Sequence, residues 1–237
     1  MDGGTGKRLL DIGCGDGSFL LAAREAGWEI MGTELNPQLA LATGLDIKEA
    51  LEQIPPSDQF DCITMWHTLE HMRDIPSVAT QMARLLKPAG RLIIAVPDYD
   101  GLQANTFRER WLHLDVPRHL YHFGAGALQH WLALGGFSVE RKWHQEFEYD
   151  LLGWSQSALN YILPYRNVFF DCITGRRKDY SSLVTALSFV LGSLLTVLAL
   201  PAVIMGTLLK RGGTLVIVAH YGSSFTGRRA NIQTAVS

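Results

Sequence analysis

Residues 8–17 read RLLDIGCGDG, an apolar run of strand character that ends in a glycine-rich turn. The next residues have helical character, so Gly13, Gly15 and Gly17 lie between a strand and the start of a helix. Glycine in such a turn lets the backbone approach a ligand closely, and the N-terminus of the helix offers N–H groups without helical partners. The segment therefore predicts a ligand-binding loop at the end of a β-strand.

Two carboxylates near this loop indicate the kind of ligand. Glu34 lies at the end of the next predicted strand, 19 residues after Gly15, where a carboxylate accepts hydrogen bonds from both hydroxyls of a ribose. Asp11 places a negative charge where a pyrophosphate would be repelled and a ligand with an ammonium and a sulfonium would be attracted. Ser18 replaces the third glycine of the dinucleotide pattern GxGxxG. We therefore expect a nucleoside-containing cofactor that is not a dinucleotide.

The rest of the chain alternates strand-like and helix-like segments, which is typical of βαβ units and a parallel sheet. The expected strands cover residues 8–12, 28–33, 46–48, 60–65, 91–96, 137–143 and 214–219. The expected helices of this part cover residues 18–26, 76–86 and 125–134, and residues 97–123 are expected to form a long loop. The pattern predicts an α/β fold.

Composition excludes several classes of protein. The 237 residues carry 21 Lys and Arg against 23 Asp and Glu, a net charge of −2, so there is no basic surface typical of nucleic-acid binding. The three cysteines form no CxxC pair, which argues against a disulfide framework or a zinc knuckle and favours a reducing compartment. The start, MDGGTGKRLLDIG, shows no secretory signal.

Four segments in order resemble the motifs of class I S-adenosylmethionine (SAM) dependent methyltransferases, closest to the ubiquinone-biosynthesis O-methyltransferase-like group: LLDIGCGDGSFL, GTELNP, FDCITMWHTLEHM and LLKPAGRLIIAVP. The resemblance implies a Rossmann-like sheet of seven strands whose last strand is antiparallel. It also implies that the glycine loop holds the methionine part of SAM, that Asp11 supports this loop and the amino group, that Glu34 binds the ribose, and that Leu35 touches the adenine. The residues that it places at the cofactor are Asp11, Gly13, Cys14, Gly15, Gly17, Glu34, Leu35, Trp66 and His67.

The motif HxxEH, formed by His67, Glu70 and His71, is also typical of zinc peptidases. Zinc binding there requires a long helix and a distant third ligand. Pro76 follows soon after, and the preceding strand favours the alternative that this segment lies beneath SAM. We expect no metal site, with a divalent metal at Glu70 and His71 as the alternative.

Residues 105–123, NTFRERWLHLDVPRHLYHF, follow the fifth expected strand, where open α/β sheets bind their ligands. Transfer of a methyl group to oxygen benefits from a base with a pKa near neutral, such as a histidine oriented by a carboxylate. The catalytic candidates in this segment are His119 first, then His122 and His113, with Asp115 as the orienting carboxylate. The alternative is a structural ion pair between Asp115 and Arg118, with the histidines capping the helix that begins at Ala125.

Residues 180–209 contain no charged residue, although the mean hydropathy of the whole chain is only +0.08. Basic residues flank the segment on both sides (Arg176, Arg177 and Lys178 before it, Lys210 and Arg211 after it). Because the strands on either side belong to one sheet, a single membrane crossing would separate them. Breaks at Pro201, Gly192 and Gly206 therefore predict a helical hairpin inserted into one side of a bilayer. The alternative is a buried hairpin in the core or in a dimer.

These observations predict a membrane-associated SAM-dependent methyltransferase, peripheral or monotopic on the cytoplasmic face, whose acceptor is an oxygen of a lipid or lipid-linked molecule. The alternatives are a methyltransferase of a soluble small molecule that dimerises through the hairpin, and a non-catalytic SAM-binding protein anchored to the membrane. The expected parts of the chain are a catalytic core at 1–145, an insertion at 146–212 with the hairpin at about 181–209, the final strand at 213–222 and a flexible tail at 223–237.

Overall fold

The computed structural model describes residues 4–176 and 179–222. They form two compact units, and each is described by itself. Of the described residues, the first unit comprises 4–96, 126–142 and 217–222, and the second comprises 97–125, 143–176 and 179–216. The tail that the sequence predicts to be flexible lies outside the described residues, as do Arg177 and Lys178 of the predicted basic flank.

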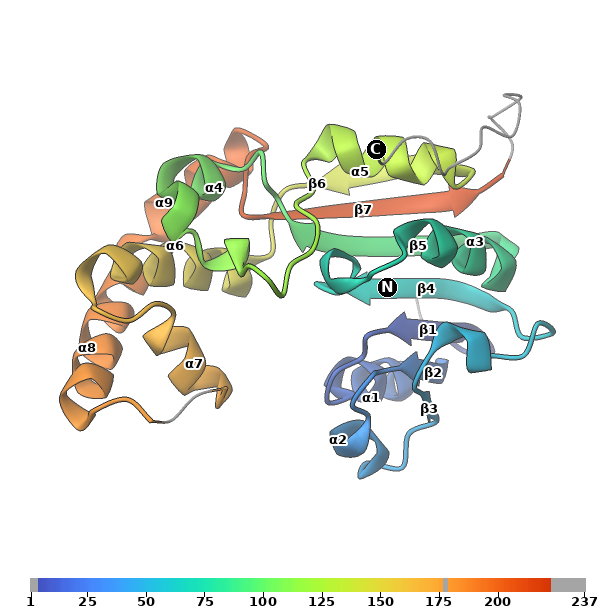
Figure 1. The fold of residues 1–237 in the computed structure, drawn as a ribbon. Helices are drawn as coiled ribbons and strands as arrows, with labels where there is room; N and C mark the ends of the chain where they lie inside the picture. The colour runs from blue at the N-terminus through green and yellow to red at the C-terminus, as the bar shows by residue number, and fades with distance from the viewer. Residues whose placement is uncertain (1–3, 177–178, 223–237) are drawn as a thin grey trace. The chain divides into compact units, whose positions relative to one another are not determined.

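A seven-stranded sheet is the framework of the first unit (Figure 1). Its strand order is β3-β2-β1-β4-β5-β7-β6; β1 to β5 pair in parallel, and β7 runs in the opposite direction. The predicted α/β sheet of seven strands with a reversed last strand is confirmed. The strands are β1 Arg8–Ile12, β2 Glu29–Thr33, β3 Ile47–Lys48, β4 Phe60–Trp66, β5 Leu86–Pro97, β6 Phe137–Trp143 and β7 Thr214–Tyr221.

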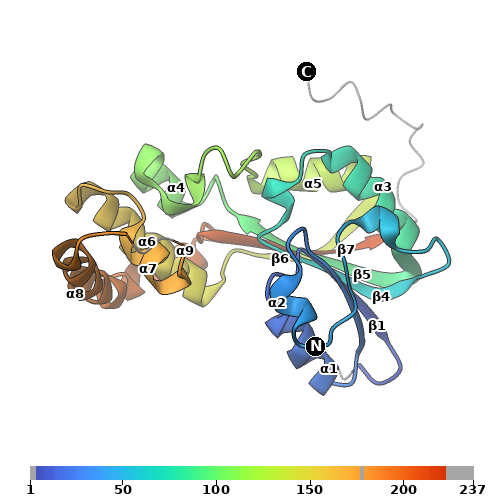
Figure 2. The ribbon, with the colours of Figure 1, turned by 60° about the horizontal axis from the view of Figure 1, so that its bottom comes forward.

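The helices of this unit cover both faces of the sheet (Figure 2). From β1 the chain moves outward to β2 and β3, whereas from β4 it moves in the other direction to β5. Because crossover connections are right-handed, the helices α1 (Ser18–Glu25) and α2 (Gln38–Leu41) lie on one face, and α3 (Ile75–Leu85) and α5 (Ala125–Leu134) lie on the other. The strand order reverses between β1 and β4, where such sheets bind ligands at their carboxyl edge.

The segment predicted as a long loop, residues 97–123, contains regular structure. It includes the helix α4 (Leu102–Phe107) and two turns of 3₁₀-helix, Arg108–Arg110 and Leu112–Leu114. The side chain of Asn105 donates to the backbone carbonyl of Gly101 over 2.8 Å and so supports the first turn of α4. The segment also groups with residues 143–216, whereas the sequence predicts it as part of the catalytic core.

The second unit is built around α6 (Phe147–Ile162), which packs against α7 (Val168–Thr174), α8 (Ser182–Leu198) and α9 (Leu200–Leu208). Buried polar side chains of α6 hydrogen-bond to backbone groups of neighbouring segments. Ser157 accepts from the N–H of Leu112, and Asn160 donates to the carbonyl of Arg110. These bonds anchor the two 3₁₀ turns on α6, since a buried backbone group needs a partner.

The prediction of a hairpin at 181–209 is wrong in one respect. The helices between β6 and β7 are present, but α8 and α9 meet at a bend of 42° and do not reverse direction. Ala199, between them, keeps right-handed helical angles, and Pro201 lies at the start of α9, where its missing N–H removes no helical hydrogen bond. The segment is therefore a bent helix pair, and Gly192 and Gly206 lie inside its helices.

Within the described ranges, no one helix is both long and apolar enough to span a membrane, and α8 and α9 meet that criterion when taken together.

A pair of glycine substitutions tests the packing of α8. A Cβ at Gly192 would lie 2.7 Å from the ring of Phe169 on α7, whereas nothing lies within 4 Å of a Cβ at Gly126 on α5. We expect Gly126→Ala to raise the free energy of unfolding by up to about 1 kcal/mol. Gly192→Ala should lower it, because α8 has to move away from α7. Thermal unfolding followed by circular dichroism measures both, and stabilisation by Gly192→Ala would contradict the packing described.

Candidate functional site

The glycine loop that follows β1 is bonded to the end of β2. The N–H groups of Gly13 and Cys14 both donate to the carbonyl of Thr33, over 2.8 and 2.9 Å. Gly13, Gly15 and Gly17 all have positive φ, which favours glycine. A side chain at Gly13 would overlap Thr68, whereas a Cβ at Gly15 would face open space. The loop therefore leaves room at Gly15 for a ligand to approach the backbone.

Glu34 stands beside this loop, as the sequence predicts. Its Oε2 accepts from the N–H of Gly15 over 3.0 Å, and its Oε1 accepts from the N–H of Asn36 over 3.1 Å. The next side chain, Leu35, is 88% exposed, so the carboxylate is followed directly by an open apolar surface. This order of groups suits a ribose followed by a flat base.

Asp11 is buried at the end of β1, and its Oδ1 accepts a 2.6 Å hydrogen bond from the hydroxyl of Thr64 on β4. Burial raises the pKa of Asp11 to about 7; the bond from Thr64 opposes this shift, and the nearby charge of Glu34 adds to it. A carboxylate in this position gains most from a cationic partner, because such a partner favours its charged form.

Trp66 and His67 lie at the carboxyl end of β4. The indole of Trp66 packs edge-on against Phe19 at 5.9 Å, and its buried Nε1 has no hydrogen-bond partner within residues 4–176 and 179–222. His67 adopts a left-handed backbone conformation with φ 49°, which costs energy for a residue other than glycine. A buried donor without a partner and a strained residue at a strand end are both typical of a ligand site.

The HxxEH motif lies in a different setting from that of zinc peptidases. Residues Leu69–His71 form one turn of 3₁₀-helix, not the long α-helix on which two zinc ligands four residues apart share a face. Nδ1 of His67 is 3.7 Å from Oε1 of the buried Glu70, so these two side chains of the motif lie close together.

The histidine candidates of the second unit are held by the backbone. Nδ1 of His119 contacts the carbonyl of His113 over 2.7 Å, and Nε2 of His122 contacts the carbonyl of Leu114 over 2.9 Å. A ring nitrogen that faces a carbonyl carries the proton, so in the neutral ring the lone pair lies on the other nitrogen. The neutral form of His119 therefore has its basic lone pair on Nε2, and that of His122 has it on Nδ1.

The other two candidates have structural surroundings. His113 is buried and packs edge-on against Trp111 at 5.6 Å. Asp115 accepts from Arg118 over 2.8 Å and lies 3.9 Å from the guanidinium of Arg176. The ion pair of Asp115 with Arg118, which the sequence analysis gives as the alternative to an orienting role, is present.

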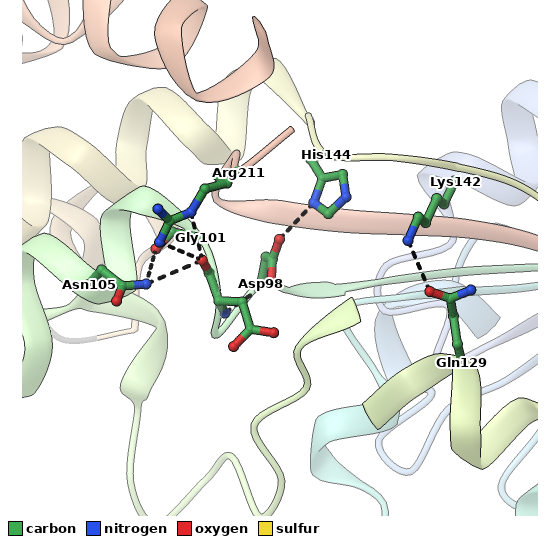
Figure 3. Close-up of polar contacts among 8 residues, drawn as sticks. Asp98, Gly101, Asn105, Gln129, Lys142, His144 and Arg211 are labelled. Carbon is green, nitrogen blue, oxygen red and sulfur yellow. Dashed lines mark hydrogen bonds and ion pairs between the residues drawn. The ribbon is translucent and has the colours of Figure 1, made fainter. Parts of the chain in front are cut away.

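The second unit contains a buried acid–imidazole pair that the sequence does not predict (Figure 3). Asp98 directly follows β5, and its Oδ2 lies 2.7 Å from Nδ1 of His144, which directly follows β6. Burial raises the pKa of Asp98, and the hydrogen bond with His144 opposes that rise. The two residues are 46 positions apart, so no local pattern joins them.

Comparison with known proteins identifies the family. A family model described as a methyltransferase domain matches residues 2–142, more than half of the chain. The chain belongs to this family. Membership in this family implies SAM as the cofactor of this methyltransferase-domain protein, and solved SAM-dependent methyltransferases have the same fold. The open backbone at Gly15, the two carboxylates and the indole N–H of Trp66, which has no partner among the described residues, fit a cationic nucleoside ligand.

Two curated relatives of this methyltransferase-domain protein are 33% identical to it. They are the ubiquinone biosynthesis O-methyltransferases of Dechloromonas aromatica, over 105 residues, and of Aeromonas salmonicida, over 104 residues. Each alignment covers 38% of this chain, and 44% and 43% of the respective relatives. The chain therefore spans less than half of the length of the curated relatives it matches.

Solved structures support the fold. An S-adenosylmethionine dependent methyltransferase from Mesorhizobium loti has a TM-score of 0.53 at 17% identity, with 93% of each chain covered. The [4+2]-cyclase SpnF has a TM-score of 0.57 at 18% identity, with 94% of this chain and 77% of that chain covered. Because the second protein is described as a cyclase, the fold alone does not define the reaction.

The raised pKa of Asp11 predicts how SAM binding depends on pH. Because SAM is cationic and the carboxylate form of Asp11 predominates only above about pH 7, affinity should be about tenfold higher at pH 8 than at pH 6. In the ligand-free protein the sign is opposite: the stability linked to this raised pKa is present at low pH and is lost as pH rises through about 7. Calorimetric titration and thermal unfolding measure the two effects.

Asp11→Asn should remove both pH dependences. Asp16→Asn is the matched control, because the hydrogen bond from the N–H of Ser18 already lowers the pKa of Asp16, which is therefore ionised across this range. Equal pH dependence of SAM binding in the wild type and in Asp11→Asn would exclude Asp11 as the group responsible.

Proposed function

We propose that this chain is a SAM-dependent methyltransferase that acts at a membrane surface, on an oxygen of a lipid or lipid-linked acceptor. The proposed membrane attachment rests on the exposed apolar surface of α8 and α9. The fold and the family support methyl transfer, and the geometry of the loop residues supports their proposed roles.

At the cofactor, each residue has a distinct role in this proposal. SAM supplies, when bound, a methyl group on a positively charged sulfur. Asp11 attracts the positively charged groups of the methionine part, and the absence of a side chain at Gly15 lets this part approach the loop closely. Glu34 accepts hydrogen bonds from the ribose hydroxyls, and Leu35 covers the adenine. Trp66 and His67 line the site at the carboxyl end of β4.

His119 is the proposed base. Its Nδ1 faces the carbonyl of His113, which leaves the lone pair of the neutral ring on Nε2. Nε2 would accept the proton that the acceptor hydroxyl loses as its oxygen forms the new bond. His122 is the second candidate for the same reason. His113 and Asp115 stay candidates of lower rank, since the first is packed among aromatic rings and the second is paired with arginines.

The helix pair α8–α9 shows the reverse of the burial pattern of a helix in a soluble protein. The buried residues are Ser188 and Gly192 on α8, and Val203 and Gly206 on α9. Apart from Val203, the large apolar side chains of the pair are partly or largely exposed, with exposures of 67% for Val190 and 78% for Leu208. A soluble helix buries its large apolar residues, whereas a helix in lipid exposes them and turns small residues to its protein partner.

The hydroxyl groups of this helix pair are also compatible with lipid. Ser188, Thr196 and Thr207 each donate to a backbone carbonyl of their own helix, so these hydroxyls need no water. The segment begins after Arg176 and ends before Lys210 and Arg211, and cations at both ends favour anionic lipid head groups.

The length of α8 favours a shallow position of the helix pair in the bilayer. α8 has 17 residues, which at about 1.5 Å per residue gives about 25 Å, less than the hydrocarbon thickness of about 30 Å. The chain returns directly to β7 of the sheet, so both ends stay on the same side of the membrane. A peripheral or monotopic attachment on the cytoplasmic face follows from the basic residues at both ends.

Flotation with liposomes that contain anionic lipid tests the membrane surface. The wild type should float, and Val190→Asp combined with Leu194→Asp should abolish most of the floating fraction, because two charges would enter the hydrocarbon boundary. Leu39→Asp combined with Leu41→Asp on α2 adds the same charge to exposed apolar sites of the first unit and should leave flotation unchanged. A wild type that stays at the bottom as a dimer would favour the soluble alternative.

Transfer of label from methyl-labelled SAM tests the enzyme. Purified protein incubated with membrane and soluble extracts of the source cells should label organic-extractable material. Label confined to water-soluble products would keep the enzyme and exclude a lipid acceptor. SAM binding without any labelled product would favour the non-catalytic SAM-binding protein.

Replacement of His119 tests the proposed base. We expect His119→Gln to lower the transfer rate by about a hundredfold, the usual contribution of a general base, with SAM affinity unchanged. His130→Gln, an exposed histidine on α5, is the control and should leave the rate unaltered. A His119→Gln protein with the wild-type rate and pH profile would rule out this role.

A further inference from the structure

The second unit contains a pocket that neither the family nor the catalytic candidates explain. Its volume is about 400 Å³, and it lies along α4 and the two following 3₁₀ turns. This volume is within the range of about 300–1,000 Å³ of small-molecule sites. The residues of its wall come from a single segment, 99–114.

Aromatic rings form one part of the wall. The centroids of Tyr99 and Trp111 are 6.3 Å apart, with the ring planes tilted by 49°. Trp111 is fixed in place, because its Nε1 donates to Oε1 of the buried Gln103, which in turn donates to the carbonyl of Asp150. Tyr99 is half exposed, with the ring of His122 at 5.4 Å. The wall therefore offers flat apolar faces that are held before any ligand binds.

Polar groups of the other wall offer both donors and acceptors. The amide nitrogen of Asn105 is bonded to the carbonyls of Gly101 and Asp100, which leaves its Oδ1 as an acceptor (Figure 3). Within the part of the chain that the structure describes, the side chains of Arg108 and Glu109 have no hydrogen-bond or ion-pair partner. Arg108 is a pure donor, and Glu109 is a pure acceptor when ionised.

The charges of the pocket select the class of ligand. One guanidinium and one carboxylate cancel, so the wall has no net charge that would favour an anion or a cation. A hydroxyl group both donates and accepts, and a ring with several hydroxyls can use Arg108, Glu109 and Asn105 together. The C–H face of such a ring packs on aromatic side chains, whose faces carry partial negative charge.

The backbone at Arg108 gives a second reason to regard the pocket as functional. Arg108 ends α4 with φ 47° and ψ −119°, a conformation that is unfavourable for any residue with a side chain. Such strain is kept where the surrounding structure uses it to aim a group. Here the strained residue is the cation of the pocket wall.

We propose that this pocket binds a sugar ring, and that the acceptor oxygen belongs to the glycan of a lipid-linked sugar. The assignment rests on the proposed function, because it names the acceptor class of the same enzyme. The aromatic pair holds the ring face, Arg108 and Glu109 hold neighbouring hydroxyls, and the lipid of the same acceptor matches the apolar surface of α8–α9.

Saturation-transfer NMR with the full chain in detergent tests the pocket without any methyl transfer. The probes are the methyl glycosides of glucose, galactose, mannose and rhamnose, with 4-hydroxybenzoate as the aromatic acid for comparison. At least one glycoside should receive saturation at its ring C–H groups. Asn105→Leu and Tyr99→Ala should each weaken that binding by about tenfold, the factor that one ordinary contact contributes. Tyr165→Ala, an equally exposed tyrosine outside the pocket wall, should bind as the wild type does.

The NMR results decide whether the pocket binds a sugar. Absence of saturation transfer to every glycoside, or equal binding in Asn105→Leu and Tyr99→Ala, overturns it, provided that both variants unfold at the wild-type temperature. Binding of 4-hydroxybenzoate in place of the glycosides assigns the pocket to an aromatic acid instead. Label transfer from SAM to a lipid fraction is measured separately, so a pocket without sugar binding and a protein without methyl transfer give different results.

Discussion

The carbonyl of Thr33 accepts two hydrogen bonds from the glycine loop, and the cofactor site depends on this contact. It joins the end of β2 to the turn after β1 and so fixes the path of Gly13 and Cys14. Glu34, the next residue after Thr33, is thereby placed at hydrogen-bond distance from Gly15. A loop without this anchor would have to be ordered by the ligand, at a cost in binding free energy.

The same edge of the sheet holds the buried carboxylate of Asp11. Asp11 lies near the end of β1, just before the loop. Its carboxylate accepts a hydrogen bond from Thr64 on the neighbouring strand β4. Its raised pKa shows that this bond does not fully compensate for burial. A cationic cofactor supplies the missing compensation, so the electrostatics of the ligand-free site and the charge of SAM are complementary.

The second unit combines features that are rarely found together in a soluble domain. Its core helix α6 buries polar side chains that hold neighbouring backbone groups, while α8 and α9 expose their large apolar residues. Packing through Ser188, Gly192 and Gly206, with Val203 as the buried apolar residue of α9, lets the helix pair approach its neighbours closely and leaves the rest of the apolar surface outside. The proposed sugar pocket and the proposed lipid surface both belong to this unit and would serve the two parts of a single acceptor.

Elements with local signals are predictable from the sequence. Strand β6 and helix α5 have the predicted bounds, and the glycine loop and Glu34 lie together as their spacing indicates. The helix α4 is not predicted from the sequence, because its short length gives little periodicity. The helical course of the chain through Ala199 is not predicted either, because a proline near the start of a helix has the same local pattern as a helix break. Tertiary structure alone decided the pair of Asp98 and His144 and the outward direction of the apolar residues of α8. Both depend on which distant segments pack together, and residue spacing along the chain carries no record of that.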